Sequence, residues 1–315
     1  MRRATTFLLA FVALLAFSTT ALAKDTVRGR LDIRHTDDMA HGKSSTRYTL
    51  HRSKRKRLNV RPTQTPNVFS GSRVIVRGRQ KGRVISGNVK AAPGVRAAGA
   101  GVLGEYRVAV LLFNFADDRY VPWTPATVEN RFFNASNSLD TYFKEQSYNQ
   151  VDLEGEVYGW YELSQNGAGC DVDAWAAAAK AKAAAEGVVL SAYDSIAYVF
   201  PDQADCSWGG LAELPGNDLW LNGTISQGVA SHELGHNMGV HHASALACGS
   251  VAYSSSCSKL EYGDPFSSMG SGSRRMAGWH LQQLGYFQPG NVQTVSADGT
   301  YNIRPRWARR RTRKC

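Results

Sequence analysis

The first third of the chain has a period-two pattern of apolar and polar residues, which is typical of β-strands. Alternating stretches rich in β-branched residues occupy positions 26–34, 46–51 and 72–89, and glycine and lysine interrupt the last of them. In a strand, such alternation places the apolar side chains on one face. We therefore expect residues 24–90 to form a small β-rich unit, such as a barrel.

Beyond residue 104, apolar runs typical of buried strands alternate with runs that have helical spacing. Pro125 near the start of one helical run and Gly187 at the end of another are typical helix boundaries. The expected strands are residues 106–115, 151–163, 195–200 and an edge strand at 211–221, and the expected helices are 124–146, 171–186 and 225–239. This order predicts an α+β (α/β-like) domain with a twisted mixed sheet.

The last predicted helix contains the sequence HELGHNMGVHH, residues 232–242. His232 and His236 are four residues apart, so on an α-helix they project from one face, one turn apart. Two imidazoles placed in this way can bind one Zn²⁺ at about 2.0–2.1 Å each. Glu233 follows the first histidine, a position from which a carboxylate reaches a water at the metal. The spacing predicts a zinc site with its own general base.

A third histidine completes the predicted metal site. Gly239 can adopt the left-handed backbone conformation, which ends a helix and turns the chain sharply. That turn would bring His242 back as the third ligand, whereas His241 is better explained as a flanking or substrate-rim residue. Three protein ligands leave a fourth position open for water, which distinguishes a catalytic zinc site from a closed structural one. We therefore expect one catalytic zinc ion.

A glycine- and serine-containing loop with a single methionine follows about thirty residues after the histidines. This loop, EYGDPFSSMG at 261–270, resembles the Met-turn of the metzincins, in which a methionine lies beneath the zinc as an apolar floor. Met269 occupies that position. Together with WGGLAELPGNDLWLNG at 208–223, the loop resembles the gametolysin family of secreted zinc peptidases.

The resemblance to gametolysins extends over roughly residues 104–288 and has three implications. It implies a metzincin-type catalytic domain with an active-site helix. It also implies protein substrates from extracellular matrix or cell walls. No tyrosine lies two residues after Met269, so no tyrosine is assigned to the substrate oxyanion, and Tyr262 is the nearest candidate.

Charge is segregated along the chain, although the net charge is +11. Residues 24–100 contain 19 Lys and Arg against 4 Asp and Glu, whereas residues 101–303 contain 9 against 22. The simplest explanation is attraction between a basic pro-segment and an acidic catalytic domain. The basic segment has few aromatic residues on which bases could stack. We therefore expect the pro-segment to bind the catalytic domain in cis, and we expect no nucleic-acid partner.

The basic segment contains no cysteine that could cap a zinc ion as a thiolate. Two explanations of latency are open. Steric cover of the cleft by the basic segment would block the site. Alternatively, an acidic or histidine side chain of the segment would cap the metal, and the candidates are His35, Asp37, Asp38 and His41.

The ends of the chain have distinctive compositions. Two arginines, an apolar run at 7–17 and the A-x-A sequence at 21–23 predict a cleaved signal peptide, export, and a mature start at Lys24. The apolar run is short for a membrane span. The small-residue stretch at 91–104 predicts a flexible linker in which the pro-segment is cut. The expected division is a signal peptide at 1–23, a pro-segment at 24–100, a catalytic domain at 101–303 and a basic tail at 304–315.

The five cysteines of an exported chain are first interpreted as disulfides. Cys248 and Cys257 bracket a short serine-rich loop and form one plausible pair. Cys170 and Cys206 form the second, which leaves Cys315 unpaired. None of the five has the spacing of a zinc finger.

These observations together predict a zinc-dependent endopeptidase that is made as a zymogen and is secreted, or located in the periplasm. The alternative is a catalytically inactive zinc-binding exoprotein or adhesin. Inactive relatives of enzymes usually lose the catalytic glutamate or a ligand, and here Glu233 and all three histidines are present. A third possibility is a protein that binds anionic polymers through residues 24–90.

Overall fold

The computed structural model describes residues 25–53, 55–95, 102–272 and 275–302. The predicted signal peptide, the mature N-terminus at Lys24, the middle of the linker and the basic tail with Cys315 lie outside these residues. Nearly all strands of the described part belong to one ten-stranded sheet, and a small hairpin forms a second sheet.

The N-terminal strands close into a five-stranded barrel, which confirms the expected β-rich unit. Strand β1 pairs with both β2 and β4, and β3 links β2 to β5, which pairs with β4, so the ring is complete. Fully buried side chains such as Leu31, Leu50 and Val76 fill the interior. The strands are β1 (Asp25–Asp38), β2 (Lys43–Ser53), β3 (Lys56–Pro62), β4 (Ser72–Lys81) and β5 (Val84–Ala91), with a 3₁₀ turn at Met39–His41 between the first two.

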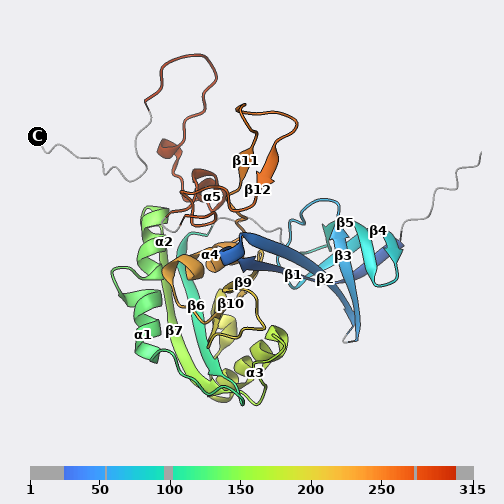
Figure 1. Cartoon of the computed structure of the whole chain (residues 1–315), viewed down its shortest axis with the longest axis vertical. Coiled ribbons are helices and arrows are strands. Elements are labelled where there is room, and N and C mark those ends of the chain that lie inside the picture. The colour runs from blue at the N-terminus through green and yellow to red at the C-terminus, as the bar shows by residue number, and fades with distance from the viewer. Residues whose placement is uncertain (1–24, 54, 96–101, 273–274, 303–315) are drawn as a thin grey trace, which may run out of the picture.

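The second half of the chain forms a mostly parallel sheet that continues from the barrel. Its order is β9-β10-β8-β6-β7, with only β9 antiparallel to its neighbour. Strand β1 of the barrel pairs antiparallel with β9, so both halves share one sheet (Figure 1). The strands are β6 (Gly104–Asn114), β7 (Val151–Glu162), β8 (Ser195–Phe200), β9 (Gly210–Glu213) and β10 (Asp218–Asn222).

Helices cover both faces of this sheet. One face packs against α3 (Val172–Ala185) through aromatic residues that include Phe113 and Trp175. The other face packs against three helices through a larger apolar core that includes Val110 and Leu234. These helices are α1 (Pro125–Glu129), α2 (Leu139–Ser147) and α4 (Gln227–Asn237).

The chain ends with short elements above the sheet. The second sheet is the hairpin of β11 (Ala245–Ala247) and β12 (Ser258–Leu260). Helix α5 (Gly278–Gln283) follows, and single 3₁₀ turns occur at Leu190–Ala192 and Pro289–Asn291. The mixed α/β architecture matches the predicted fold class at that level. In the part of the chain that the structure describes, no helix has the length and apolar character to cross a bilayer.

Two predicted elements are wrong in their extent. The helix expected at 124–146 is split into α1, a π-helical turn at Asn130–Asn134 and α2. The backbone is extended at Ala135, and the Ser138 side chain then accepts from the amide of Thr141 to cap a new helix. Polar residues that favour turns and caps therefore override the apolar periodicity here.

The edge strand expected at 211–221 is instead a hairpin. Strands β9 and β10 are antiparallel neighbours, and the turn between them contains Pro215 and Gly216. Proline has no amide hydrogen to donate to a sheet ladder, so residues 211–221 cannot continue as one strand. Of these two strands, only β9 lies at an edge of the C-terminal sheet, where β1 pairs with it, and β10 lies inside the sheet next to β8.

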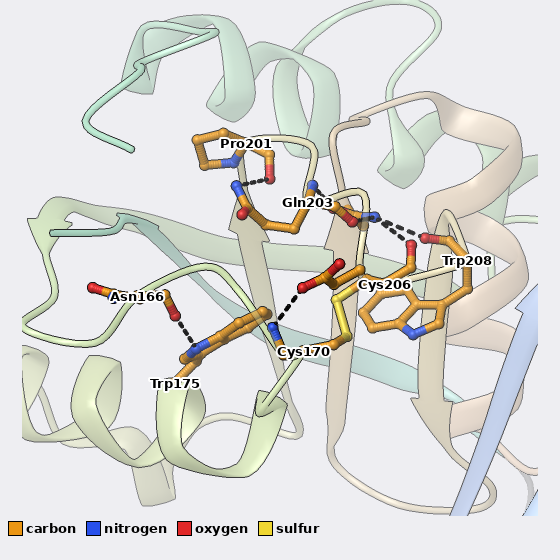
Figure 2. Close-up of a disulfide and its surroundings, with 10 residues drawn as sticks. Asn166, Cys170, Trp175, Pro201, Gln203, Cys206 and Trp208 are labelled. Carbon is orange, nitrogen blue, oxygen red and sulfur yellow. Dashed lines mark hydrogen bonds between the residues drawn. A yellow bond between two sulfur atoms is a disulfide. The ribbon is translucent and has the colours of Figure 1, made fainter. Parts of the chain in front are cut away.

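Two disulfides confirm the predicted cysteine pairs. Cys170 is bonded to Cys206 and Cys248 to Cys257. Figure 2 shows the first of them beside the indole of Trp208, where it ties the start of α3 to the loop before β9. The buried Asn222 side chain holds the same loop by donating to the backbone oxygens of Gln203, Cys206 and Trp208.

Removal of Cys170–Cys206 is expected to destabilise the protein more than removal of Cys248–Cys257. The first bond closes a loop of 36 residues and the second a loop of 9. Loop-closure entropy gives losses of about 4 and about 2.5 kcal/mol, respectively. Urea unfolding of the two double-alanine variants measures both values. Equal losses would show that loop entropy does not set the difference.

Candidate active site and metal centre

Helix α4 carries the first two predicted metal ligands and the predicted base. It begins at Ser226, whose side chain accepts from the amide of Val229, and Ala230–Asn237 are buried as a block. His232 and His236 lie on one face, with ring centroids 4.7 Å apart. Both are fully buried, so the helix delivers two imidazoles into a closed interior position.

Gly239 makes the turn that brings back the third histidine. Its φ of 99° is in the left-handed region, and the amide of Val240 bonds back to the carbonyl of Gly235. The chain then places the Nε2 of His242 at 3.1 Å from the Nε2 of His232. His241 is exposed and outside the cluster, as predicted for a flanking residue.

All three histidines have an oxygen acceptor at Nδ1. His232 Nδ1 lies 2.7 Å from the carbonyl oxygen of Ser268, and His236 Nδ1 lies 2.8 Å from that of Val240. His242 Nδ1 lies 2.8 Å from Glu261 Oε1. Each acceptor requires a proton on Nδ1, so each Nε2 presents a lone pair. This is the outer arrangement that orients histidine ligands towards one metal.

Glu233 lies beside this cluster and makes no hydrogen bond. The side chain is fully buried, and neither carboxylate oxygen has a partner among the described residues. Burial raises the pKa of Glu233 well above its ordinary value, and the neighbouring Asp37 carboxylate raises it further. The edge strand approaches closely, because a Cβ on Gly210 would lie 2.0 Å from Glu233 Oε1.

Met269 packs under α4, as expected of a Met-turn. It is fully buried, and its carbonyl accepts from the amide of Ala243, just after His242. A Cβ on Gly235 would lie 2.8 Å from Met269 Sδ, so glycine at this position permits the close approach. The preceding residue, Ser268, supplies the carbonyl that orients His232. The loop therefore supports the histidines from below.

Tyr262 lies closer to the site than the sequence indicated. Its ring centroid is 4.2 Å from that of His242, and its hydroxyl donates to Asp37 Oδ1 at 2.5 Å. The preceding residue, Glu261, was not predicted as a site residue. Its carboxylate bonds to both His242 and Lys259. The only available signal was its position next to Tyr262 in the gametolysin-like loop.

The N-terminal barrel contributes two side chains to the cluster. Asp37 Oδ1 lies 2.7 Å from His242 Nε2, and Oδ2 lies 3.3 Å from His236 Nε2. The ring of His35 is 4.6 Å from the rings of both these histidines. Burial by itself raises the pKa of Asp37, but the neighbouring imidazoles, His236 above all, outweigh it and lower the pKa.

The other two candidates for capping the metal lie away from it. Asp38 accepts from the amide of His41, and its carboxylate is 2.8 Å from His41 Nδ1. The His41 side chain is exposed. Adjacent residues of a strand point to opposite faces, which explains why Asp37 enters the cluster and Asp38 does not.

Comparison with known families gives a clear result. The family model for gametolysin peptidase M11 matches residues 107–309, which is more than half of the chain. The chain belongs to the gametolysin family. It is therefore a member of a metallopeptidase family, and the matched residues contain the three histidines, Glu233 and Met269. No curated protein matches the chain.

The residues of this gametolysin-family site fit a metal ion. His236 Nε2 and Asp37 Oδ2 are fully buried, and neither has a hydrogen-bond partner. Two overlapping groups of residues each offer ligand atoms that all lie within 4.8 Å of one another. One group is His35, Asp37, His236 and His242, and the other is Asp37, His232 and Glu233. Buried polar atoms without partners are costly, and a cation between these lone pairs would satisfy them.

Proposed function

We propose that the protein is a zinc-dependent endopeptidase of the metzincin type, with His232, His236 and His242 as ligands and Glu233 as general base. The observation that carries the proposal is the convergence of three oriented Nε2 atoms beside a buried carboxylate without partners. Imidazole ligands with open positions favour zinc, although the same donors also accept other divalent metals.

The residues divide the chemistry of peptide hydrolysis among them. When bound, zinc supplies Lewis acidity to the attacking water and to the substrate carbonyl. Glu233 takes the proton of that water, and its raised pKa suits a group that must hold the proton before passing it to the leaving amine. Tyr262, with its hydroxyl inside the cluster, is the candidate donor to the oxyanion.

We propose that the substrate is an extended polypeptide that adds to β9. Edge strands have unpaired backbone groups that bind a peptide by strand addition. The β1–β9 pairing supports this mode, because an extended segment already forms an antiparallel ladder there, from Arg34 opposite Glu213 to Asp37 opposite Gly210. Matrix or cell-wall proteins are the substrates that the family resemblance suggests.

We also propose that the chain is exported as a zymogen and that the barrel is its pro-segment. Beyond β1, the barrel contacts the catalytic half through Ser70, whose hydroxyl donates to Glu213 and whose amide donates to the carbonyl of Pro215. The basic charge of the segment and the acidic charge of the catalytic half favour this association. Cleavage within 91–104 would leave the segment held by non-covalent contacts alone.

Chelation and metal restoration test the proposed function. Protein processed in the linker and separated from its N-terminal segment is incubated with a peptide library, then with a chelator, and then with zinc, cobalt or magnesium. We expect internal cleavage, its loss on chelation, and its recovery with zinc or cobalt only. Cleavage that survives metal removal would refute the proposal, as would processed, metal-loaded protein that cleaves nothing. The second result would favour the zinc-binding exoprotein or adhesin.

A further inference from the structure

We infer that Asp37 is a fourth protein ligand of the metal in the unprocessed chain, and that β1 holds it there from the position of the substrate. The inference rests on the proposed function, because it concerns the same metal. It adds a ligand from outside the residues that match the gametolysin family model.

The position of Asp37 is fixed by the sheet. Asp37 is the last residue of β1 to pair with β9, and its partner, Gly210, is the residue that lies against Glu233. Alternation along β1 sends Ile33, His35 and Asp37 inward and leaves the intervening residues partly exposed. The β1–β9 ladder therefore ends beside the carboxylate of Glu233, and Asp37 at that end of β1 points inward.

The surroundings of the carboxylate are those of a metal ligand. It is fully buried, and it lies 2.7, 3.3 and 3.7 Å from the Nε2 atoms of His242, His236 and His232. Tyr262 donates to Oδ1, whereas Oδ2 has no partner. A buried anion next to three neutral imidazole lone pairs is unfavourable without a cation between them. Carboxylate oxygen is a common fourth donor to zinc.

The same arrangement explains how the unprocessed chain would be catalytically inactive. A substrate carbonyl and a water both need positions at the metal, and Asp37 takes one of them. The backbone of β1 takes the ladder on β9 that an extended substrate needs. Latency therefore depends on one side chain and one strand, and cleavage in the linker alone does not remove them. The segment must also dissociate.

Replacing Asp37 by alanine in the full chain tests the ligand directly. The protein is loaded with cobalt, and its visible absorption and the rate of cobalt transfer to a chelator are measured. Both are measured on the Glu233→Gln background, so that no chain cleaves itself. We expect Asp37→Ala to change the spectrum and to speed metal loss at least tenfold. Asp38→Ala is the matched control and should change neither.

A second variant covers the possibility that alanine disturbs folding. Asp37→Asn keeps the shape and removes the charge, and we expect the same direction of change. With Glu233 restored, the unprocessed Asp37→Ala chain is expected to stay inactive on extended peptides, because the backbone of β1 still occupies β9. A cobalt spectrum unchanged in both variants would refute Asp37 as a ligand. Processed wild type is assayed in parallel. Its activity would show that the proposed function holds even if Asp37 is not a ligand.

The same strand also occupies a second position on the catalytic half, three residues before Asp37. The guanidinium carbon of Arg34 lies 4.7 Å from the ring centroid of Trp220, and its Nη2 lies 2.5 Å from Asp173 Oδ1. Trp220 stacks in turn on Tyr198, with ring centroids 5.2 Å apart. Arg34 thus packs on the ring of Trp220 and forms an ion pair with Asp173.

The charges around this position favour a cation. Glu213 is directly opposite Arg34 in the ladder, and Asp218 begins the next strand. Burial raises the pKa of Glu213, with the charge of Asp218 adding to the effect, while Arg34 opposes it. The nearby Lys180 pairs with Asp218. Removal of the barrel would therefore leave Asp173 and Glu213 without Arg34, above an indole face that attracts cations.

The geometry points to a subsite for an arginine or lysine of the substrate, three residues before the residue that faces the metal. It rests on the proposed addition of the substrate to β9 in the direction of β1. The recognised group is a long cationic side chain in an extended peptide, held by a cation–π contact and by a half-exposed carboxylate.

Matched peptides test this subsite on processed protein. Peptides that carry arginine, norleucine or glutamate at the position are compared by kcat/KM, for wild type, Asp173→Asn and Glu154→Gln. We expect about a tenfold preference for arginine over norleucine in wild type. The preference should fall to a few-fold in Asp173→Asn and at high salt, since Asp173 is half exposed.

The control variant separates local from overall charge. Glu154 is exposed on β7, at the opposite edge of the sheet, and its replacement by glutamine changes the net charge equally. It should keep the full preference. Equal cleavage of the arginine and norleucine peptides by wild type would refute the subsite. Cleavage of the norleucine peptide that stops on chelation would still support the proposed peptidase.

Discussion

Glu233→Gln is expected to lower kcat of the processed protein by about 10³-fold and to leave the metal in place. Glutamine has nearly the same shape as glutamate but cannot accept the proton of the attacking water. The metal ligands are oriented by Ser268, Val240 and Glu261 rather than by Glu233, so their geometry does not depend on it. Peptide cleavage and metal content measured on one preparation test both statements.

Stability gives an independent check on Glu233. Because burial raises its pKa above that of the unfolded chain, the ionised carboxylate opposes folding at neutral pH, and the cost disappears as the pH falls and the group is protonated. Neutral glutamine removes this cost. We therefore expect Tm at pH 7 to stay the same or to rise. Glu154→Gln, at an exposed position, is the control for the change in net charge. Normal cleavage by Glu233→Gln would refute the assignment of Glu233 as the base.

Gly210→Ala is expected to lower kcat/KM by about 100-fold without unfolding the protein. The added Cβ would lie 2.0 Å from Oε1 and 2.5 Å from Cδ of Glu233, so either the carboxylate or strand β9 must move. A displacement of about 1 Å at a catalytic group is sufficient for a loss of this size. The loss should appear with every peptide sequence, because the base itself is displaced.

The neighbouring glycine provides a matched control for this substitution. A Cβ on Gly209 would meet nothing within 4 Å, so Gly209→Ala should retain activity. Both variants should keep the circular dichroism spectrum of wild type. Equal activity of the two alanine variants would show that β9 does not press against Glu233, and would also weaken the proposed position of the substrate on this strand.

Local patterns predicted several elements correctly because the determining interactions are themselves local. The strand at Ser195–Phe200 was predicted within its observed limits, and α3 was predicted within one residue at each end. The split of the 124–146 helix was missed because the apolar spacing continues across a polar capping sequence. The hairpin at β9 was missed because the turn sequence from Pro215 to Asp218 was included in one predicted strand.

The site shows the same division. The spacing of the histidines, the glycine turn and the methionine loop are short-range features, so the sequence by itself determined His232, His236, His242, Glu233 and Met269 as a group. It also determined the family and the opposed charges of the two halves, and it suggested the two cysteine pairs that the structure joins. Helical periodicity and turn chemistry are sufficient for the histidines and the glycine turn, since these residues lie within about a dozen positions of one another. The methionine loop, about thirty residues further on, came from the resemblance to the metzincins.

Only the tertiary structure decided which strand of the barrel meets the cleft. Four candidates for capping the metal were equivalent in sequence, and the pairing of β1 with β9 selected Asp37 and His35 while it left Asp38 and His41 at the surface. Contacts between residues nearly two hundred positions apart depend on strand register. A shift by one residue would reverse every side chain of β1, so no local pattern could have fixed it.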